Sequence, residues 1–265
     1  MAIQLLASKE VWSFMPLSRG RIMSDWDYLA DDISNWILKY AENNKISSLV
    51  VGVSGGIDSA VVSTLCAKTG LTTVVVNMPI KQDKSQYNLS NQHIDWLVSK
   101  WNNVESQIID LSETYDTLYS KLADYDVSEL SMVNTRARLR MSTLYALAGS
   151  KNGIVVGTGN KVEDFGIGFF TKYGDGGVDI SPIADLYKSE VYSLAKSLDI
   201  IQPIQDAPPT DGLWNDGRTD EDQIGATYEE LEWAMNEIEN PSLEKELNER
   251  LADVMRIYLK FNHMN

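Results

Sequence analysis

Hydrophobic positions along the chain alternate between a helical spacing and short continuous runs. Over residues 26–40 the apolar side chains recur at helical spacing, and Ser24 stands ahead of them as a candidate N-cap. Residues 48–53 form a short apolar run rich in β-branched side chains, which is typical of a buried strand. The same criteria predict, in chain order, a helix over 58–68, a strand over 72–78, a helix over 88–101, a strand over 104–111, a helix over 130–148 and a strand over 153–156.

This order of elements predicts the fold class. Strands that alternate with helices of this length are joined by crossovers and form a parallel sheet. We therefore expect an α/β fold with a twisted parallel sheet and helices on both faces. After residue 165 the alternation weakens, and the pattern predicts a helix near 188–198 and then a helical C-terminal extension. Residues 1–265 are expected to form a single domain, with 1–22 as a candidate N-terminal extension.

Charge and hydropathy exclude two classes of partner. The net charge is −15 and the pI is near 4.5. A general nucleic-acid-binding role is disfavoured because no basic surplus is available to neutralise phosphates. No apolar run approaches the ~18 residues of a bilayer span, so no membrane association is expected. The charged residues Lys9 and Glu10 fit a secretory signal poorly.

Cysteine and histidine are scarce. The single cysteine, Cys66, excludes an internal disulfide and favours a cytoplasmic location, and its apolar neighbours predict a buried core residue. The two histidines, His93 and His263, are too few for a typical zinc site and make a histidine-based triad unlikely to be the catalytic device. We expect both histidines on helix surfaces.

The stretch Ser54-Gly55-Gly56-Ile57-Asp58-Ser59 lies between a predicted strand and a predicted helix. Glycines let backbone amides approach a ligand, and a helix start adds unsatisfied amides, which together make an anion site. A carboxylate such as Asp58 beside a phosphate site indicates a bridging Mg²⁺. For Ser-Gly-Gly alone, a tight turn with Asp58 or Ser59 capping the helix is an equally good interpretation. The stretch matches neither the P-loop nor the dinucleotide-binding glycine pattern.

Further candidates follow the later strands. Arg136 and Arg140 share one helix face, and Arg138 points nearly opposite. Arginines suit an anionic ligand, but a solvated basic face explains them better when nothing else is considered. Glu163, after the last predicted strand, could complete a metal site with Asp58 and ATP phosphates, or could simply be a favourable charge near a helix start.

Two later regions are also candidates for function. Residues 168–179 form a glycine-punctuated, aromatic-rich loop suited to stacking, although a structural loop with a small core of its own has the same composition. Lys188 is either a ligand-binding lysine or an ordinary surface lysine at a helix start. Residues 205–224 are long for a loop without structure, and such loops are often functional.

Several literal strings resemble one enzyme family. The loop at 54–59 resembles the pyrophosphate loop of the N-type ATP pyrophosphatases. Within that superfamily, Asn-x-x-Ala-Arg-x-Arg-Met at 134–141 and Phe-Phe-Thr-Lys-Tyr-Gly-Asp-Gly-Gly-x-Asp at 169–179 are similar to the ammonia-dependent NAD synthetases. The resemblance implies an adenine nucleotide alpha hydrolase-like fold. It also implies an ATP-dependent ligase that adenylates deamido-NAD, releases pyrophosphate, and lets ammonia displace AMP to form NAD⁺.

The resemblance also implies roles for individual residues, carried over motif by motif. Asp58 and Lys188 are the implied catalytic residues, and Asp58 with Glu163 would hold Mg²⁺. The implied ATP-binding residues are Gly52, Val53, Ser54, Gly55, Gly56, Ile57, Asp58, Ser59, Lys81, Thr158, Lys188 and Thr210. The implied deamido-NAD-binding residues are Arg138, Phe169, Lys172, Asp175 and Asp179.

The family is dimeric, so a homodimer is expected. Free ammonia is the expected nitrogen source, because a glutaminase domain would need further residues and a nucleophilic cysteine, and Cys66 lies inside a predicted core helix. A separate glutaminase subunit is the alternative source. The sequence departs from the family at its end, where Asn262-His263-Met264-Asn265 stands in place of a basic, proline-containing segment.

Two rival functions share part of this pattern. A tRNA-thiolating relative of the superfamily usually carries extra cysteines and a basic face, and this chain has one cysteine and a net charge of −15. A regulatory nucleotide-binding module without catalysis would not need to retain the acids Asp58 and Glu163.

Overall fold

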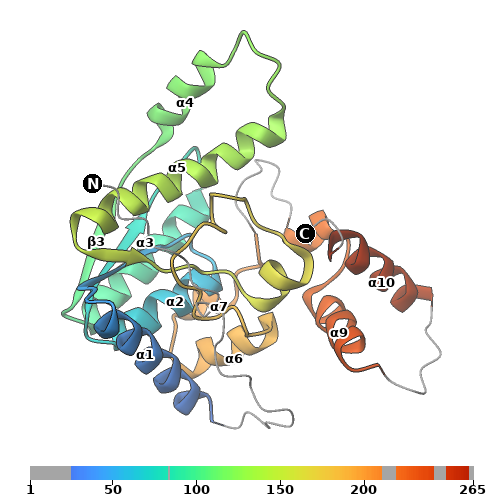
Figure 1. The fold of residues 1–265 in the computed structure, drawn as a ribbon, viewed down its shortest axis with the longest axis horizontal. Coiled ribbons are helices and arrows are strands. Elements are labelled where there is room, and N and C mark those ends of the chain that lie inside the picture. The colour runs from blue at the N-terminus through green and yellow to red at the C-terminus, as the bar shows by residue number, and fades with distance from the viewer. Residues whose placement is uncertain (1–24, 83, 211–218, 242–248, 263–265) are drawn as a thin grey trace.

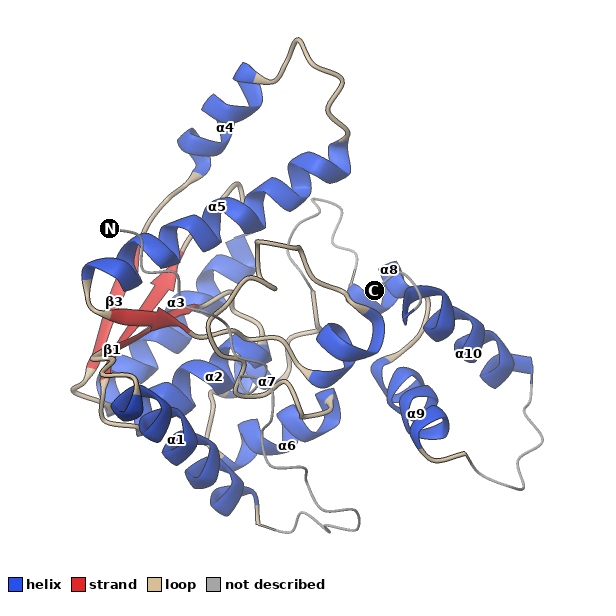
Figure 2. Cartoon of the chain, in the orientation of Figure 1, coloured by secondary structure: helices blue, strands red, loops and turns tan. Residues whose placement is uncertain are grey.

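The computed structural model describes residues 25–82, 84–210, 219–241 and 249–262. It is built on a parallel sheet (Figures 1 and 2), as the sequence predicts, with strand order β3-β2-β1-β4. The strands are β1 (Ser48–Gly52), β2 (Thr72–Asn77), β3 (Val104–Ile108) and β4 (Gly153–Val155). The expected extension at 1–22, residues 211–218 of the candidate functional loop at 205–224, and His263 lie outside the described residues.

Helices cover both faces of the sheet. One face carries α2 (Ile57–Lys68) and α3 (Lys84–Lys100), with α1 (Trp26–Asn43) and α6 (Lys188–Ser197) packed against α2. The other carries α5 (Glu129–Ser150), with α4 (Ser112–Lys121) packed against it. The remaining helices are α7 (Gln202–Gln205), α8 (Asp220–Ile224), α9 (Tyr228–Glu239), α10 (Glu249–Asn262) and the π-helix η2 (Val162–Ile167).

The strand side chains divide the core into two layers. Leu49 and Val51 of β1 point into the layer formed by α1, α2 and α6, whereas Val50 points into the layer beneath α5. This alternation follows from the two-residue period of a strand. Helix α2 is buried on nearly every side, with ten of its 12 residues buried. Cys66 is among them, as predicted, and burial raises the pKa of its thiol.

The predicted elements are present with shifted ends, and some details differ from expectation. The N-cap of α1 is Asp25, whose Oδ1 accepts from the Tyr28 N–H at 3.0 Å, and not Ser24. Helices α4, α7 and α8 and the π-helix η2 have no counterpart in the prediction, and α8 lies within the stretch 205–224 that was expected to be a loop. Only Tyr115 of α4 is buried, so this helix lacks an apolar stripe that could reveal it.

The surface position expected for His93 is wrong. Its side chain is fully buried between α3 and α2, where Nε2 lies 2.9 Å from Ser63 Oγ. The buried face of α3 contains Ser90 and His93 beside Ile94 and Leu97, so hydrophobicity alone does not identify it. Burial lowers the pKa of His93 to about 3. No helix in the described ranges is both long and apolar enough to cross a bilayer.

The order of the strands places the functional loops. The chain runs outward from β1 through β2 to β3, and then returns to β4 on the other side of β1. The loops after β1 and β4 therefore diverge at the carboxyl edge of the sheet. Open α/β sheets bind ligands at such a crevice.

Burial of His93 predicts a pH dependence of stability. Below a pH of about 6.5 the unfolded chain binds a proton that the folded chain excludes until the pH approaches about 3. Wild type should therefore lose stability more steeply than His93→Gln as pH falls from about 6.5, by up to about 1.4 kcal/mol per pH unit. Urea unfolding across this range measures both slopes.

A matched control keeps the imidazole and removes its partner. Ser63→Ala should retain the steep slope, because the buried imidazole still excludes its proton. Equal slopes for wild type and His93→Gln would contradict the assignment.

Candidate active site

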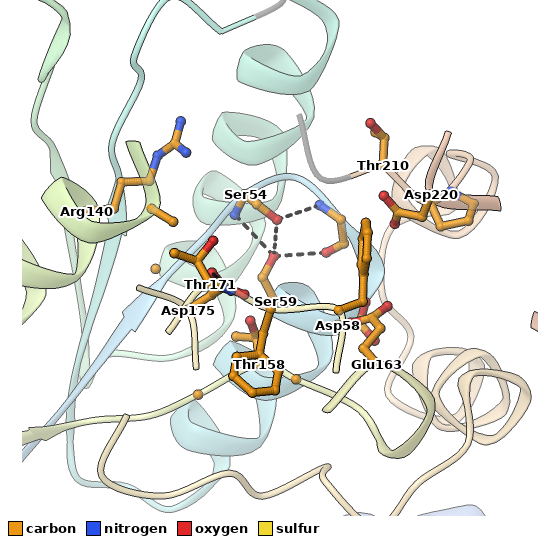
Figure 3. Close-up of a pocket in the computed structure, with 18 of the residues that line it drawn as sticks. Ser54, Asp58, Ser59, Arg140, Thr158, Glu163, Thr171, Asp175, Thr210 and Asp220 are labelled. Carbon is orange, nitrogen blue, oxygen red and sulfur yellow. Dashed lines mark hydrogen bonds between the residues drawn. The ribbon is translucent and has the colours of Figure 1, made fainter. Parts of the chain in front are cut away.

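A cavity opens at the carboxyl edge of the sheet (Figure 3), where the loops after β1 and β4 diverge. Its walls come from residues 52–59, the end of β2, the inner face of α5, residues 155–159, the segment 163–178, α6, and residues 207–210 with α8. The cavity therefore collects residues from segments between Gly52 and Gln223 that lie far apart in the sequence.

The loop from Ser54 to Ser59 is closed by its own hydroxyls. Ser59 Oγ donates to Gly56 O at 2.9 Å and accepts from the Ser54 N–H at 3.2 Å. Ser54 Oγ lies 3.1 Å from Ser59 Oγ and accepts from the Gly56 N–H at 3.2 Å (Figure 3). Gly55 has a φ of +95°, and a Cβ there would lie 2.7 Å from the backbone oxygen of Gln86. The loop therefore requires a glycine at this position.

The start of α2 lies open to the cavity. Its N-cap is Gly56, which makes no side-chain capping bond. Neither Asp58 nor Ser59 caps the helix. The α2 terminus, with its unsatisfied amides and positive dipole end, is thus suited to an anion.

Two carboxylates meet one ammonium group beside this helix start. Lys188 Nζ donates to Asp58 Oδ2 at 2.6 Å and to Glu163 Oε1 at 3.0 Å. The three residues come from α6, α2 and η2, and their side chains are largely buried. Lys188 is therefore not the ordinary surface lysine that its position at a helix start allows.

The charges in this cluster perturb one another. Burial raises the pKa of Asp58, and the charge of Glu163 adds to that effect against the opposing charge of Lys188. For Glu163, burial acts to raise the pKa, but Lys188 and the Tyr228 hydroxyl outweigh it and hold the pKa below its usual value. The two carboxylates likewise raise the pKa of Lys188 despite burial, so the lysine is charged.

Asn160 links the Asp58 carboxylate to the backbone next to Glu163. It is fully buried, and its Nδ2 donates to Asp58 Oδ1 at 3.2 Å. Its Oδ1 accepts from the backbone N–H groups of Val162 and Glu163 at 3.0 and 3.1 Å. One amide side chain thus orients Asp58 and satisfies the first turn of η2, a role that the sequence analysis did not identify.

Most of the predicted ATP-binding residues line the cavity. Those that line it are Gly52, Val53, Ser54, Gly56, Ile57, Asp58, Ser59, Thr158, Lys188 and Thr210. Gly55 is not in the lining, but its positive φ sets the shape of the loop. Lys81 lies outside the lining and pairs with Asp116 of α4 at 2.6 Å.

The predicted deamido-NAD-binding residues separate into two groups. Phe169 and Asp175 line the cavity. Arg138 lies outside it and donates from Nε to the backbone oxygen of Lys172 at 3.1 Å. Asp179 accepts from the Val155 N–H at 2.8 Å and from the Tyr145 hydroxyl at 3.1 Å, so it also satisfies an amide at the end of β4.

Arg140 and Asp164 also line the cavity, although neither was assigned to it individually from the sequence. Arg140 donates from Nε to Met78 O at 3.0 Å, and burial with the nearby charge of Arg136 lowers its pKa to about 10. Burial and the charge of Glu163 raise the pKa of Asp164 to about 7. The pKa of the predicted residue Asp175 is likewise raised by burial, to about 6. The sequence signals for Arg140 were its shared face with Arg136 and the string at 134–141, and Asp164 had no signal of its own.

The donor set fits a magnesium ion shared with phosphates. In the described part of the chain, no three His, Cys, Asp or Glu side chains are arranged to hold a metal by themselves. Asp58 and Glu163, however, converge on one cation, the ammonium of Lys188. Mg²⁺ is commonly held by one or two carboxylates together with substrate phosphates and water.

Comparison with known proteins identifies the family. The family model described as NAD synthase matches residues 29–261. The chain belongs to the NAD synthase family. It is 38% identical over 205 residues to the NH(3)-dependent NAD(+) synthetase of Finegoldia magna, covering 77% of this chain and 82% of that one. It is 39% identical over 239 residues to the enzyme of the same name from Alkaliphilus metalliredigens, covering 83% and 90%.

The family model and these relatives show a ligase of the NAD synthase family. Solved structures agree with this family. NMN synthetase from Francisella tularensis superposes with a TM-score of 0.79 at 32% identity, covering 91% of this chain and 95% of that one. The NH3-dependent NAD synthetase from Campylobacter jejuni gives a TM-score of 0.72 at 28% identity, covering 91% and 96%. These NAD synthase relatives share the adenine nucleotide alpha hydrolase-like fold, so the predicted fold is confirmed.

The bonds of Asn160 predict a large effect on stability. Asn160→Ala removes three hydrogen bonds at a fully buried position and leaves two backbone N–H groups without their acceptor. We expect the free energy of unfolding to fall by about 1–3 kcal/mol. Asn44→Ala, which removes one exposed bond to Tyr40 O, is the control and should change it by about 0.5 kcal/mol. Equal losses in urea unfolding would contradict this role for Asn160.

Proposed function

We propose that this ligase converts deamido-NAD to NAD⁺ with ATP and ammonia, the last step of NAD biosynthesis. The supporting observation is that the open helix start at Gly56 and the Asp58–Lys188–Glu163 cluster face one cavity in a member of this family. An anion site beside two carboxylates suits a triphosphate bound with Mg²⁺. The substrate and products are carried over from the family resemblance.

The first half of the reaction forms an adenylate. The nicotinate carboxylate of deamido-NAD attacks the α-phosphorus of ATP, and pyrophosphate leaves. Backbone amides at 54–59 hold the departing pyrophosphate, and Lys188 neutralises charge that develops on the phosphates. Mg²⁺ held by Asp58 and Glu163 would neutralise further phosphate charge. Thr158 and Thr210 line the same cavity and complete the ATP site.

The second half forms the amide. Ammonia attacks the activated carbonyl carbon, AMP leaves, and the nitrogen loses a proton. The protein's main contribution is to align two anionic substrates that repel one another. Phe169 and Asp175, which line the cavity, would position the nicotinate end of deamido-NAD.

The proposed deamido-NAD residues that lie outside the cavity support a homodimer in which they face the second copy. Arg138, Lys172 and Asp179 gather along the exposed side of α5, through the Arg138 bond to Lys172 O and the Tyr145 bond to Asp179. Exposed apolar side chains occur on and beside α4 and α5, at Tyr119, Tyr125, Val127, Leu130 and Tyr145. Contiguous exposed apolar surface marks interaction sites. We propose that two copies meet here and that deamido-NAD extends into this contact.

Sedimentation velocity tests the dimer. Wild type should sediment with twice the chain mass of 29.7 kDa. Tyr125→Glu places a charge on a side chain that is 69% exposed and should shift the protein towards the monomer. Tyr28→Glu on α1, at 57% exposure, is the control and should leave the dimer intact. A monomeric wild type at micromolar concentration would reject the proposal.

The location, nitrogen source and partners of the enzyme follow from the same features. We infer a cytoplasmic enzyme with one catalytic domain, which uses free ammonia and has neither a nucleic-acid nor a membrane partner. A net charge of −15 supports the absence of a nucleic-acid partner, and the family match across residues 29–261 supports one domain.

A second candidate substrate is the mononucleotide carboxylate that corresponds to NMN. The observation that favours it is the likeness to the Francisella tularensis NMN synthetase, with a TM-score of 0.79. The adenylation chemistry would be the same, and only the size of the carboxylate substrate would differ. Arg138 and Lys172 lie outside the cavity lining, so the substrate-binding role that the resemblance implies for them favours the longer dinucleotide.

One assay tests the function. Purified protein with ATP, Mg²⁺, ammonium and deamido-NAD should form NAD⁺, AMP and pyrophosphate, detected by chromatography. Nicotinate mononucleotide supplied instead should give a lower kcat/KM. A higher kcat/KM for the mononucleotide would replace the substrate assignment, and no amide product from either would reject the function.

The variant Asp58→Ala should be inactive in that assay. Removing one of two carboxylates from the cation site should reduce turnover below detection while the protein remains folded by circular dichroism. Asp116→Ala, which removes the exposed partner of Lys81, should keep most activity. Retained turnover in Asp58→Ala would refute the metal role.

A further inference from the structure

One tyrosine from the C-terminal helices reaches into the carboxylate cluster. Tyr228 begins α9, and its side chain is buried. Its hydroxyl lies 2.6 Å from Glu163 Oε1 and 3.3 Å from Asp220 Oδ2, and Lys188 Nζ lies 4.7 Å from its ring centroid. Tyr228 therefore contacts two residues of the proposed metal and phosphate site, although no motif drew attention to it.

We propose that Tyr228 is a positioning residue that fixes Glu163 for binding a divalent cation. The proposal rests on the proposed function only in taking Asp58 and Glu163 as cation ligands. A neutral tyrosine hydroxyl has one hydrogen to donate. The shorter distance assigns that hydrogen to Glu163, so Tyr228 and Lys188 both donate to the same oxygen, Oε1. Together they fix the rotation of the carboxylate.

The hydroxyl is held rigidly by its own helix. The N-cap Thr227 and Glu230 form a reciprocal capping box at the start of α9. The Tyr228 N–H also donates to Glu221 Oε1 of α8 at 2.9 Å. Two elements thus fix the backbone of Tyr228, and a precise hydroxyl position follows.

Glu163 itself depends on this support. It lies in the π-helix η2, against which both α9 and α10 pack. Val162 and Ile167 of η2 belong to the same apolar cluster as Leu231 and Val254. The C-terminal helices therefore hold the backbone of Glu163 by packing and its carboxylate through Tyr228. Groups that orient metal ligands typically change metal affinity about 10- to 100-fold when they are removed.

The contact with Asp220 connects this support to the loop that lines the cavity. Asp220 is buried and lines the cavity, and its backbone N–H donates to Pro209 O at 3.2 Å. Pro209 directly precedes Thr210, a proposed ATP contact. Tyr228 therefore lies between the carboxylate that would hold the cation and the segment that would hold the nucleotide.

Cation binding to Tyr228→Phe tests the proposal, because this change removes only the hydroxyl. Mn²⁺ serves as the probe, and its free concentration is measured by electron paramagnetic resonance with the non-hydrolysable α,β-methylene analogue of ATP present. The Kd for Mn²⁺ should rise about 10-fold, while the thermal midpoint stays close to that of wild type. Tyr258→Phe is the matched control, since Tyr258 is a buried tyrosine of the same cluster whose hydroxyl accepts from Asn262 Nδ2 at 3.4 Å, and the Kd of this variant for Mn²⁺ should equal that of wild type.

A double-mutant cycle shows whether the effect passes through Glu163. In a Glu163→Gln background, adding Tyr228→Phe should cause no further loss of Mn²⁺ affinity. Unchanged affinity in Tyr228→Phe, an equal loss in Tyr258→Phe, or a Tyr228→Phe protein that does not fold would overturn the proposal. The Mn²⁺ measurement uses no carboxylate substrate, so an error in the proposed substrate would leave its outcome unaffected.

Discussion

The site depends on one buried ammonium group between two carboxylates. Lys188 joins α6 to α2 through Asp58 and to η2 through Glu163, at 2.6 and 3.0 Å. Burying charges costs free energy that the pairing only partly returns, so such a cluster is weak evidence of stabilisation. The cluster instead matters because it positions the groups of the site. With Asn160 and Tyr228, it fixes two carboxylates from distant parts of the chain beside an open helix start.

The sheet topology makes this convergence available. Asp58 follows β1 and Glu163 follows β4, and these strands are neighbours because the chain reverses direction across the sheet after β3. The reversal separates the two loops and leaves a crevice at the carboxyl edge. Helix α6 then returns to pack against α2, which brings Lys188 between the acids. Asp58 and Glu163 are thus far apart in the sequence but close in space, because β4 pairs with β1 and not with β3.

Local sequence signals predicted the fold and much of the site. The residues that the sequence did not predict are those whose roles depend on contacts between distant segments of the chain. The apolar run before Ser54 and the glycines after it specify a strand, a turn and a helix start by themselves. His93 was misplaced because its burial depends on α2, 30 residues away. Tyr228 had no local signal, since its role is defined by Glu163 across 65 residues. Asn160 lies between Thr158 and Glu163, two residues that the resemblance implied, but its own bond to Asp58 is a tertiary contact that no local pattern indicates.

Charge in the cavity constrains how a nucleotide can bind there. Among the residues that the structure describes, its lining includes five acids, Asp58, Glu163, Asp164, Asp175 and Asp220, and two basic residues, Lys188 and Arg140. A triphosphate would be repelled by such a lining unless other positive charge accompanied it. Protonation of Asp164, whose pKa is raised to about 7, removes part of the repulsion near neutral pH, whereas Asp175, with a pKa of about 6, stays mostly ionised there. The helix start at Gly56 supplies only partial charge. Electrostatics therefore favours ATP entering together with a divalent cation, and the acids that repel the free nucleotide are the groups suited to bind its metal complex.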